Sequence, residues 1–183
     1  MLRVARAKLP SVRFQIGEFA TFRLPKKAEA ITCLFSAIGY LRTDAELLGA
    51  FRNFYANLVP EGVALIEPWI TPQAYHGSRP HLVQYVSPDL VIARVNTTVR
   101  RGDVTSMALH HLIGTSKGVR HVVERHTMRM VPIHRLLVLL REAGFRPRFL
   151  RRGLPMGRGL LVARRPAAPR RAALEIVARS DPG

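Results

Sequence analysis

Residues 28–70, AEAITCLFSAIGYLRTDAELLGAFRNFYANLVPEGVALIEPWI, decide the fold of this chain. Residues 30–34 are a nearly continuous apolar run that is too short for a buried helix, so they predict a strand covered on both faces. Thr43 comes next, and Glu46 three residues later completes the pattern of a capping box, which predicts the start of a helix. Apolar residues recur at helical spacing from there to Leu58 and give this helix one apolar stripe.

A second buried strand is predicted directly after the helix. Pro60 and Gly62 stop the helix, and residues 63–67, VALIE, are again mostly apolar. A strand–helix–strand unit usually forms a right-handed parallel crossover, and ligands of such sheets bind beyond the carboxyl ends of the strands. Residues 35–40 and 67–69 follow these two ends, and together they form the rim where we expect chemistry.

The flanking segments extend this unit into an α/β fold. Residues 1–10 predict the end of a helix, and residues 11–17, SVRFQIG, predict a strand because apolar and polar residues alternate there. A helix is predicted over residues 133–143, and two strands are predicted over residues 145–150 and 160–163.

The segment from about residue 76 to 130 has a different character. Strand-like pieces lie there, separated by turn sequences such as Ser87-Pro88-Asp89 and Arg101-Gly102-Asp103. This spacing is typical of antiparallel strands. We therefore expect an antiparallel β insertion that covers the rim.

The composition is that of a globular protein. Of the 183 residues, 48% are apolar and 22% are charged. No apolar run approaches the length that crosses a bilayer and the N-terminus lacks a signal-peptide core, so we expect a cytoplasmic location and no membrane partner. The single cysteine, Cys33, lies in a predicted buried strand, where we expect it to be a packing residue rather than a nucleophile.

The net charge of +17 is compatible with a nucleic acid, an anionic substrate or a coding bias. The chain has 25 arginines and only four lysines, a ratio typical of GC-rich genomes. The arginines are dispersed, without the interleaved aromatic residues that single-strand binders use. We therefore expect no nucleic-acid partner, and a small basic nucleic-acid-binding protein remains the alternative from another functional class.

Four segments together are similar to one enzyme family: ITCLFSAIGYL (31–41), EGVALIEPW (61–69), GVRHVVERH (118–126) and PMGRGLLVARRP (155–166). In this order they resemble the S-adenosylmethionine-dependent N,N-dimethyltransferases of nucleotide-linked amino sugars in macrolide biosynthesis. The resemblance implies a Rossmann-like class I methyltransferase fold, S-adenosylmethionine as cofactor and a nucleotide-linked amino sugar as substrate. A homodimer is a further expectation.

The resemblance also implies the organisation of the chain. Residues 1–166 correspond to the C-terminal portion of a methyltransferase domain, with the insertion at about 76–130 over the active-site rim, and 167–183 are expected to be a weakly ordered basic tail. The family's first βα units, with a Gly-rich cofactor loop and an acid for the ribose, have no counterpart in this sequence. The glycines of residues 153–159 join two late strands and so fail the structural test for a cofactor loop. We therefore expect an N-terminally truncated chain, and the alternative is a non-catalytic remnant of such an enzyme.

The resemblance implies four cofactor-binding residues. Glu18 and Phe19 occupy the place of an acid–hydrophobic pair that flanks the adenine, although the family's acid is usually Asp. Phe35 and Ser36 directly follow the strand predicted over residues 30–34, and they match a segment of the family that contacts cofactor or substrate. The alternatives are that Glu18 is an exposed loop acid and that Phe35 belongs to the core.

Three residues are expected to bind substrate. Tyr40 resembles a residue that lines the pocket, and Trp69 supplies an apolar wall. Arg158 is expected to place its guanidinium against the diphosphate, where bidentate geometry favours Arg over Lys. Its alternative is a solvent-exposed hairpin arginine.

Glu67 and His126 are the candidate catalytic residues. The Glu67 carboxylate follows a strand end and is suited to orient an amino sugar's ammonium, with a structural hydrogen-bond acceptor as the alternative. His126 lies in the stretch that resembles the family's lid and shares a strand face with Glu124. We expect no metal, because the adjacent His110 and His111 point to opposite faces and no ligand spacing emerges.

Overall fold

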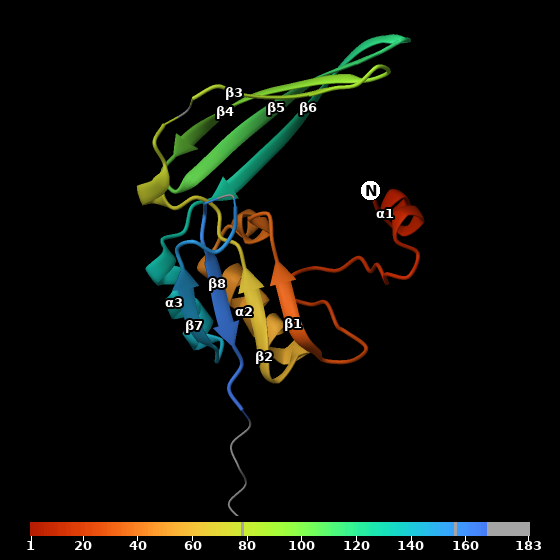
Figure 1. Ribbon diagram of the computed structural model, residues 1–183. Coiled ribbons are helices and arrows are strands. Elements are labelled where there is room, and N and C mark those ends of the chain that lie inside the picture. Colours follow the sequence, from red (N-terminus) through yellow and green to blue (C-terminus); the bar gives the residue numbers. More distant parts are fainter. Residues whose placement is uncertain (78, 156, 168–183) are drawn as a thin grey trace, which may run out of the picture.

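The computed structural model describes residues 1–77, 79–155 and 157–167 and arranges them around two four-stranded sheets (Figure 1). The mixed sheet has the strand order β1 (Ala28–Cys33), β2 (Leu58–Ile66), β8 (Leu160–Arg164) and β7 (Arg146–Leu150). The antiparallel sheet consists of β3 (His81–Val86), β4 (Val91–Arg101), β5 (Val104–Thr115) and β6 (Gly118–Arg129). β1, β7 and β8 lie within two residues of their predicted positions, and β2 begins earlier than predicted. The four strands of the antiparallel sheet lie within the predicted insertion, whereas the proposed tail falls largely outside the described residues.

The predicted strand–helix–strand unit is confirmed. β1 and β2 pair in parallel, and α2 (Asp44–Asn57) connects them. Thr43 caps this helix by accepting a hydrogen bond from the Glu46 N–H, while the Glu46 carboxylate accepts from the Thr43 N–H. This reciprocal pair is the capping box that the sequence predicts, and it fixes where the helix begins.

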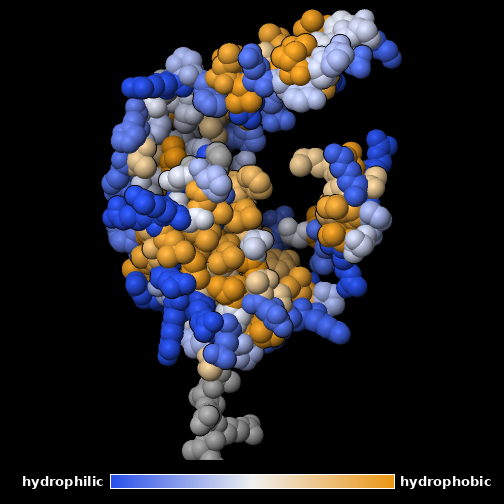
Figure 2. Space-filling model, in the orientation of Figure 1, coloured by the Kyte–Doolittle hydropathy of each residue, from blue (hydrophilic) through white to orange (hydrophobic). Residues whose placement is uncertain are grey.

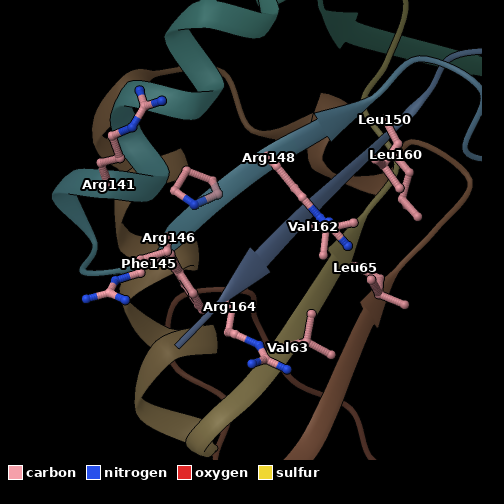
Figure 3. Close-up of a pocket in the computed structure, with 11 residues that line it drawn as sticks. Val63, Leu65, Arg141, Phe145, Arg146, Arg148, Leu150, Leu160, Val162 and Arg164 are labelled. Carbon is pink, nitrogen blue, oxygen red and sulfur yellow. The ribbon is translucent and has the colours of Figure 1, made fainter. Parts of the chain in front are cut away.

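The core lies on one face of the mixed sheet. α2 and α3 (Ile133–Glu142) pack there against the fully buried Ala64 and Ile66 of β2. Val63 and Leu65 alternate with these residues and therefore point to the other face. That face has an open hollow of about 1060 Å³ with an apolar floor and several arginines around it (Figure 3).

The prediction that the first strand is covered on both faces is wrong. In β1, all of which the structure describes, only Cys33 is buried. β1 is an edge strand of the mixed sheet, and α2 and α3 cover a single face. Burial raises the pKa of the Cys33 thiol to about 12, so this side chain remains a neutral packing group.

The strand predicted over residues 11–17 is also wrong. These residues, all of them described, form irregular chain after the short helix α1 (Leu2–Lys8), and Ile16 is 81% exposed. Alternation of apolar residues creates a strand only where a neighbouring strand pairs with the backbone. Figure 2 shows this N-terminal segment standing apart from the main body. No described helix is long and apolar enough to cross a membrane.

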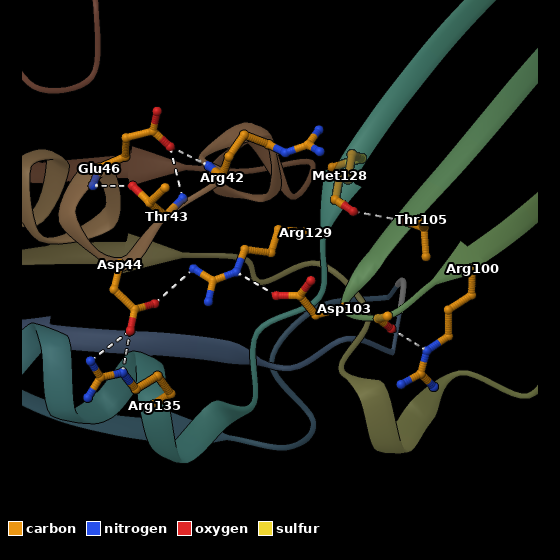
Figure 4. A network of polar contacts seen from close by, with 11 residues as sticks. Arg42, Thr43, Asp44, Glu46, Arg100, Asp103, Thr105, Met128, Arg129 and Arg135 are labelled. Atoms are coloured by element: carbon orange, nitrogen blue, oxygen red, sulfur yellow. Dashed lines mark hydrogen bonds and ion pairs between the residues drawn. The ribbon is translucent and has the colours of Figure 1, made fainter.

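Charged residues join the two sheets at the start of α2 (Figure 4). Arg129, at the end of β6, contacts Asp44 through Nη1 at 2.8 Å and Asp103 of the β4–β5 turn through Nε at 2.9 Å. Arg135 of α3 contacts the other Asp44 oxygen at 2.7 Å. Asp44 thereby connects α2, α3 and the antiparallel sheet, and its charge also suits the N-terminus of a helix.

The pKa of Asp44 is lowered, first by the hydrogen bond from Arg129 and then by Arg135, against the opposing effect of burial. Because the folded-state pKa lies below the ordinary value of 3.8, the ion pairs stabilise the fold above that value, and the contribution is lost as the pH falls through the folded-state pKa. We predict that Asp44→Asn lowers the free energy of unfolding by about 1–2 kcal/mol at neutral pH and by much less in acid. Urea denaturation at several pH values measures this.

The matched control is Asp89→Asn, in the exposed turn between β3 and β4. This variant is expected to follow the wild type at every pH. A loss in Asp44→Asn that does not shrink in acid would show that the ion pairs are not the cause.

Candidate active site

The chain makes a strained turn where β1 ends. Phe35 and Ser36 have φ values of 53° and 58°, in the left-handed region that non-glycine residues rarely adopt. Such positions cost about 1–3 kcal/mol each and persist where the surroundings fix them. The Phe35 ring is 85% exposed, whereas Ser36 is fully buried. The turn therefore projects an aromatic ring outward from the carboxyl end of the strand, and Phe35 does not belong to the core.

Two side chains hold this turn in place. Glu67 accepts a hydrogen bond from the Phe35 N–H at 2.7 Å through Oε2. Arg158 Nη1 donates to Ser36 Oγ at 2.9 Å and lies 3.4 Å from Glu67 Oε1. The Ser36 hydroxyl donates in turn to the Pro68 carbonyl at 2.8 Å. A buried carboxylate and its partner arginine thus connect β1, β2 and the β7–β8 loop at one point.

The same arginine connects this point to the antiparallel sheet. The guanidinium carbon of Arg158 lies 4.6 Å from the ring centroid of Trp69, a cation–π contact. The Trp69 indole N–H donates to Thr105 Oγ1 at 2.9 Å, and the Thr105 hydroxyl donates to the Met128 carbonyl at 3.1 Å. Gly39 lies against the same surface, where a Cβ atom would come within 2.8 Å of Met128 Cε. A small residue at position 39 therefore permits the rim and the antiparallel sheet to meet.

A phenol and an imidazole meet on the exposed side of this rim. Tyr40 ends the short helix η1 (Ala37–Tyr40), and its hydroxyl lies 2.6 Å from His126 Nδ1 on β6. The other ring nitrogen of His126 lies 3.7 Å from Glu124 Oε2. The predicted shared face of Glu124 and His126 is confirmed, and it brings them to the rim.

A pocket of about 370 Å³ lies beside the carboxyl end of β1. Glu18 and Phe19 form part of its wall, together with Cys33, Leu34 and Ala37. The volume is within the range of small-molecule sites, and most of the lining is apolar with a few polar groups. The pocket, the strained turn and the phenol–imidazole pair thus all adjoin residues 33–40, whereas the hollow of Figure 3 lies on the uncovered sheet face and lacks acidic groups among its lining residues.

The structure places the predicted site residues in three neighbouring groups. Glu18 and Phe19 line the pocket, and Tyr40 lies with His126. The remaining residues form the network that holds the strained turn. It includes the backbone N–H of Phe35 and the side chains of Ser36, Glu67, Trp69 and Arg158, while the Phe35 ring points outward. Arg158 is not the solvent-exposed hairpin arginine given as its alternative, because its side chain is only 20% exposed. Sequence reasoning missed Thr105, since nothing in its local pattern marks it as a partner of Trp69.

Comparison with known proteins gives consistent matches, although no protein-family model matches the chain. The chain is 36% identical over 169 residues to dTDP-3-amino-3,4,6-trideoxy-alpha-D-glucopyranose N,N-dimethyltransferase from Streptomyces venezuelae, a match that covers 88% of this chain and 68% of that protein. It spans 63–68% of the length of the curated relatives it matches.

Two solved structures agree with this match. The crystal structure of Streptomyces venezuelae DesVI has a TM-score of 0.85 and 34% identity, covering 91% of this chain and 70% of that one. An S-adenosylmethionine-bound amino pentose methyltransferase from Micromonospora echinaspora, involved in calicheamicin biosynthesis, has a TM-score of 0.80 and 33% identity, covering 90% and 69%.

The buried ion pair generates a stability prediction. Arg158→Met keeps much of the apolar length of the side chain but leaves the Glu67 carboxylate, 3% exposed, without its cation. We expect the free energy of unfolding to fall by about 3 kcal/mol, because a buried charge without its partner is costly. Adding Glu67→Gln should restore part of the loss, which urea denaturation of the single and double variants measures.

Arg164→Met is the matched control. Arg164 lies 3.9 Å from Glu61 with both side chains more than 60% exposed, so its loss should have little effect. If Arg158→Met is no more destabilising than Arg164→Met, the ion pair does not hold the turn.

Proposed function

Because this chain belongs to the family of dTDP-amino sugar N,N-dimethyltransferases, which have the class I methyltransferase fold, we propose that it acts in S-adenosylmethionine-dependent N-methylation of a nucleotide-linked amino sugar in antibiotic biosynthesis. The observation that carries this proposal is the 36% identity over 88% of the chain. A cytoplasmic location, and a role without a nucleic-acid or membrane partner, stay predictions from the sequence.

The pocket beside β1 supports the cofactor assignment. Glu18 offers a carboxylate that can accept from an exocyclic amine, and Phe19 offers an aromatic contact on the same wall. Phe35 does not line this pocket, but it directly follows Leu34 of the pocket wall, and its exposed ring offers a further aromatic surface next to it. Ser36 supports this surface without facing the pocket, because its buried hydroxyl is hydrogen-bonded to the Pro68 carbonyl and to Arg158. These residues fit the adenine end of S-adenosylmethionine, whereas the family's Gly-rich loop and ribose acid have no counterpart in this sequence. When bound, the cofactor supplies an electrophilic methyl group on a sulfonium.

The opposite side of the rim supports the substrate assignment. Trp69 and Tyr40 offer an apolar wall and a hydroxyl, respectively. The contacts of Arg158 to Ser36 and Glu67 use Nη1, so the other guanidinium donors can meet a diphosphate. A bound nucleotide sugar would therefore have its anionic part near Arg158 and its amine toward the exposed residues of the rim.

Alignment is the main contribution that this chain can make to the reaction. The bound cofactor would supply the methyl group, and the sugar amine would be the nucleophile that accepts it while the electrons of the C–S bond stay on sulfur. Holding the two reactants in line and excluding water supplies most of the acceleration. Both oxygens of Glu67 are engaged, so we assign Glu67 the role of holding the turn at Phe35 and Ser36 in place. We assign His126 the role of taking up the proton of the amine. Two methyl groups are added in succession, since the monomethyl amine still carries a lone pair.

The proposal is tested by calorimetric titration with S-adenosylhomocysteine, followed by methyl transfer to dTDP-3-amino-3,4,6-trideoxyglucose, with mass spectrometry of the products. We expect binding, and a monomethyl product that precedes the dimethyl product. Phe35→Ala should weaken S-adenosylhomocysteine binding about tenfold, because it removes an aromatic contact surface.

Tyr85→Ala, which removes an aromatic ring that is 56% exposed on β3, is the control and should bind like the wild type. Wild-type protein that neither binds S-adenosylhomocysteine nor transfers a methyl group would contradict the proposal and favour a non-catalytic remnant.

We also propose that two copies associate through the antiparallel sheet. Cross-strand pairing places Leu82, Val95, His110 and Val123 in one row, on the face opposite to His126. Eight apolar residues on this face are more than a third exposed: Leu82, Val86, Val91, Val95, Val99, Leu112, Val119 and Val123. A broad apolar surface of this kind is rare on monomers, and a self-complementary contact about a twofold axis would cover it.

Val95 lies in the middle of this face, where association of two copies would remove an introduced carboxylate from water. We predict that Val95→Glu raises the dimer dissociation constant about 100-fold. Sedimentation velocity over a range of concentrations measures the change. Val138→Glu, at a position 42% exposed on α3, is the control and should leave the dimer intact. A wild-type protein that sediments as a monomer throughout would contradict the proposed dimer.

A further inference from the structure

A phenol, an imidazole and a carboxylate lie in sequence along the exposed side of the rim. They are Tyr40 of η1 and His126 and Glu124 of β6. We propose that these three groups form a proton relay that removes the proton of the sugar ammonium before each methyl transfer. This inference rests on the function proposed above and assigns the base for that reaction.

The distances define the direction of the relay. Tyr40 Oη and His126 Nδ1 are 2.6 Å apart, a short hydrogen bond. A ring proton on Nε2 faces the Glu124 carboxylate, and we therefore assign the tyrosine hydroxyl as the donor to Nδ1. Nε2 lies 3.7 Å from Glu124 Oε2, within the range of an ion pair once the ring takes up a second proton. The Tyr40 side is open, because this residue is 46% exposed.

The scaffold fixes both ends of the relay. Tyr40 ends η1, which begins directly after the strained turn at Phe35 and Ser36. His126 is paired in register with Met107 of β5, within a continuous antiparallel ladder. Neither end belongs to a long flexible loop, so the 2.6 Å contact is built from two rigid elements.

The charges around the imidazole suit a transient cation. Glu124 is shared, because its Oε2 also lies 3.7 Å from His111 Nε2 on β5. Arg94 of β4 is in register with His111 and adds positive charge on that face, and Arg42 donates from Nη1 to the Thr127 carbonyl at 3.4 Å. Glu124 is therefore the acid placed to balance an imidazolium at position 126. The surrounding arginines favour rapid loss of that proton to solvent.

The chemistry balances over one turnover. A sugar ammonium gives its proton to the Tyr40 oxygen while the Tyr40 proton passes to His126 Nδ1, which leaves a neutral amine and an imidazolium beside Glu124. The imidazolium then loses its Nδ1 proton to solvent, which regenerates the Nε2–H tautomer and leaves Nδ1 free to accept from the Tyr40 hydroxyl again. Each methyl transfer produces a new ammonium, so the relay operates before the second transfer and again before release. Glu67 is unsuited to this role because it is buried, with both oxygens engaged.

The relay is needed only while the amine is protonated. An alkyl ammonium is the main form near about pH 7 and loses its proton to solvent near about pH 10. We therefore expect Tyr40→Phe to slow single-turnover methyl transfer about 100-fold near neutrality, and we expect that loss to shrink as the pH rises. His126→Gln should behave in the same way, and Glu124→Gln should show a smaller loss because it acts through His126.

Two matched controls separate this effect from general damage. Tyr85→Phe removes an exposed hydroxyl on β3, and His121→Gln removes a histidine from the opposite face of β6. Both should retain the wild-type pH profile. A Tyr40→Phe profile equal to that of the wild type, or a loss that is the same at every pH, would overturn the relay.

A second measurement does not depend on activity. ¹⁵N NMR of the histidine rings in the complete chain should show neutral His126 with its proton on Nε2, and Tyr40→Phe should shift the Nδ1 resonance. A proton on Nδ1 of His126, or an Nδ1 resonance that is unchanged in Tyr40→Phe, would overturn the relay. If wild-type protein transfers no methyl group at any pH, the proposed function fails, and this ring measurement still decides whether the relay exists.

Discussion

The arrangement of the two sheets depends on one arginine. Arg129 bridges Asp44 at the start of α2 and Asp103 in the β4–β5 turn. The chain has 29 basic and only 12 acidic side chains, so mutual repulsion of positive charge opposes compact packing. Asp44 and Asp103 replace that repulsion by attraction to Arg129 at the place where the sheets meet. This contact holds the end of β6, and with it the strand that carries His126, against the start of α2.

The strained turn after β1 makes sense only together with its supports. Two consecutive left-handed residues are unfavourable in an unsupported chain. Glu67 and Arg158 offset that cost from β2 and the β7–β8 loop, so the turn is determined by contacts distant in sequence. The resulting geometry directs Phe35 outward and begins η1, which delivers Tyr40. The strained conformation of the turn therefore determines where the side chains of Phe35 and Tyr40 lie.

The elements that could be predicted from the sequence are those whose signals are local. Thr43 and Glu46 are three residues apart, and Gly144, with φ of 100°, follows α3 as expected for a helix C-terminus. The strand proposed over residues 11–17 failed because alternation does not provide a pairing partner. The rim network is less accessible to such reasoning, since Arg158 and Ser36 are 122 residues apart. The family resemblance pointed to these residues, but their mutual contacts emerge only from the fold.

The division of the rim between two sheets has a consequence for how the site works. The mixed sheet supplies the pocket wall, the turn and Tyr40, while the antiparallel sheet supplies His126 and Glu124. A proton can pass between Tyr40 and His126 only while the sheets keep their present separation, because hydrogen bonding weakens steeply with distance. Trp69, bound to Thr105 and stacked against Arg158, ties the sheets beside that contact. The residues that look purely structural at this junction therefore set the distance on which the chemistry of the rim depends.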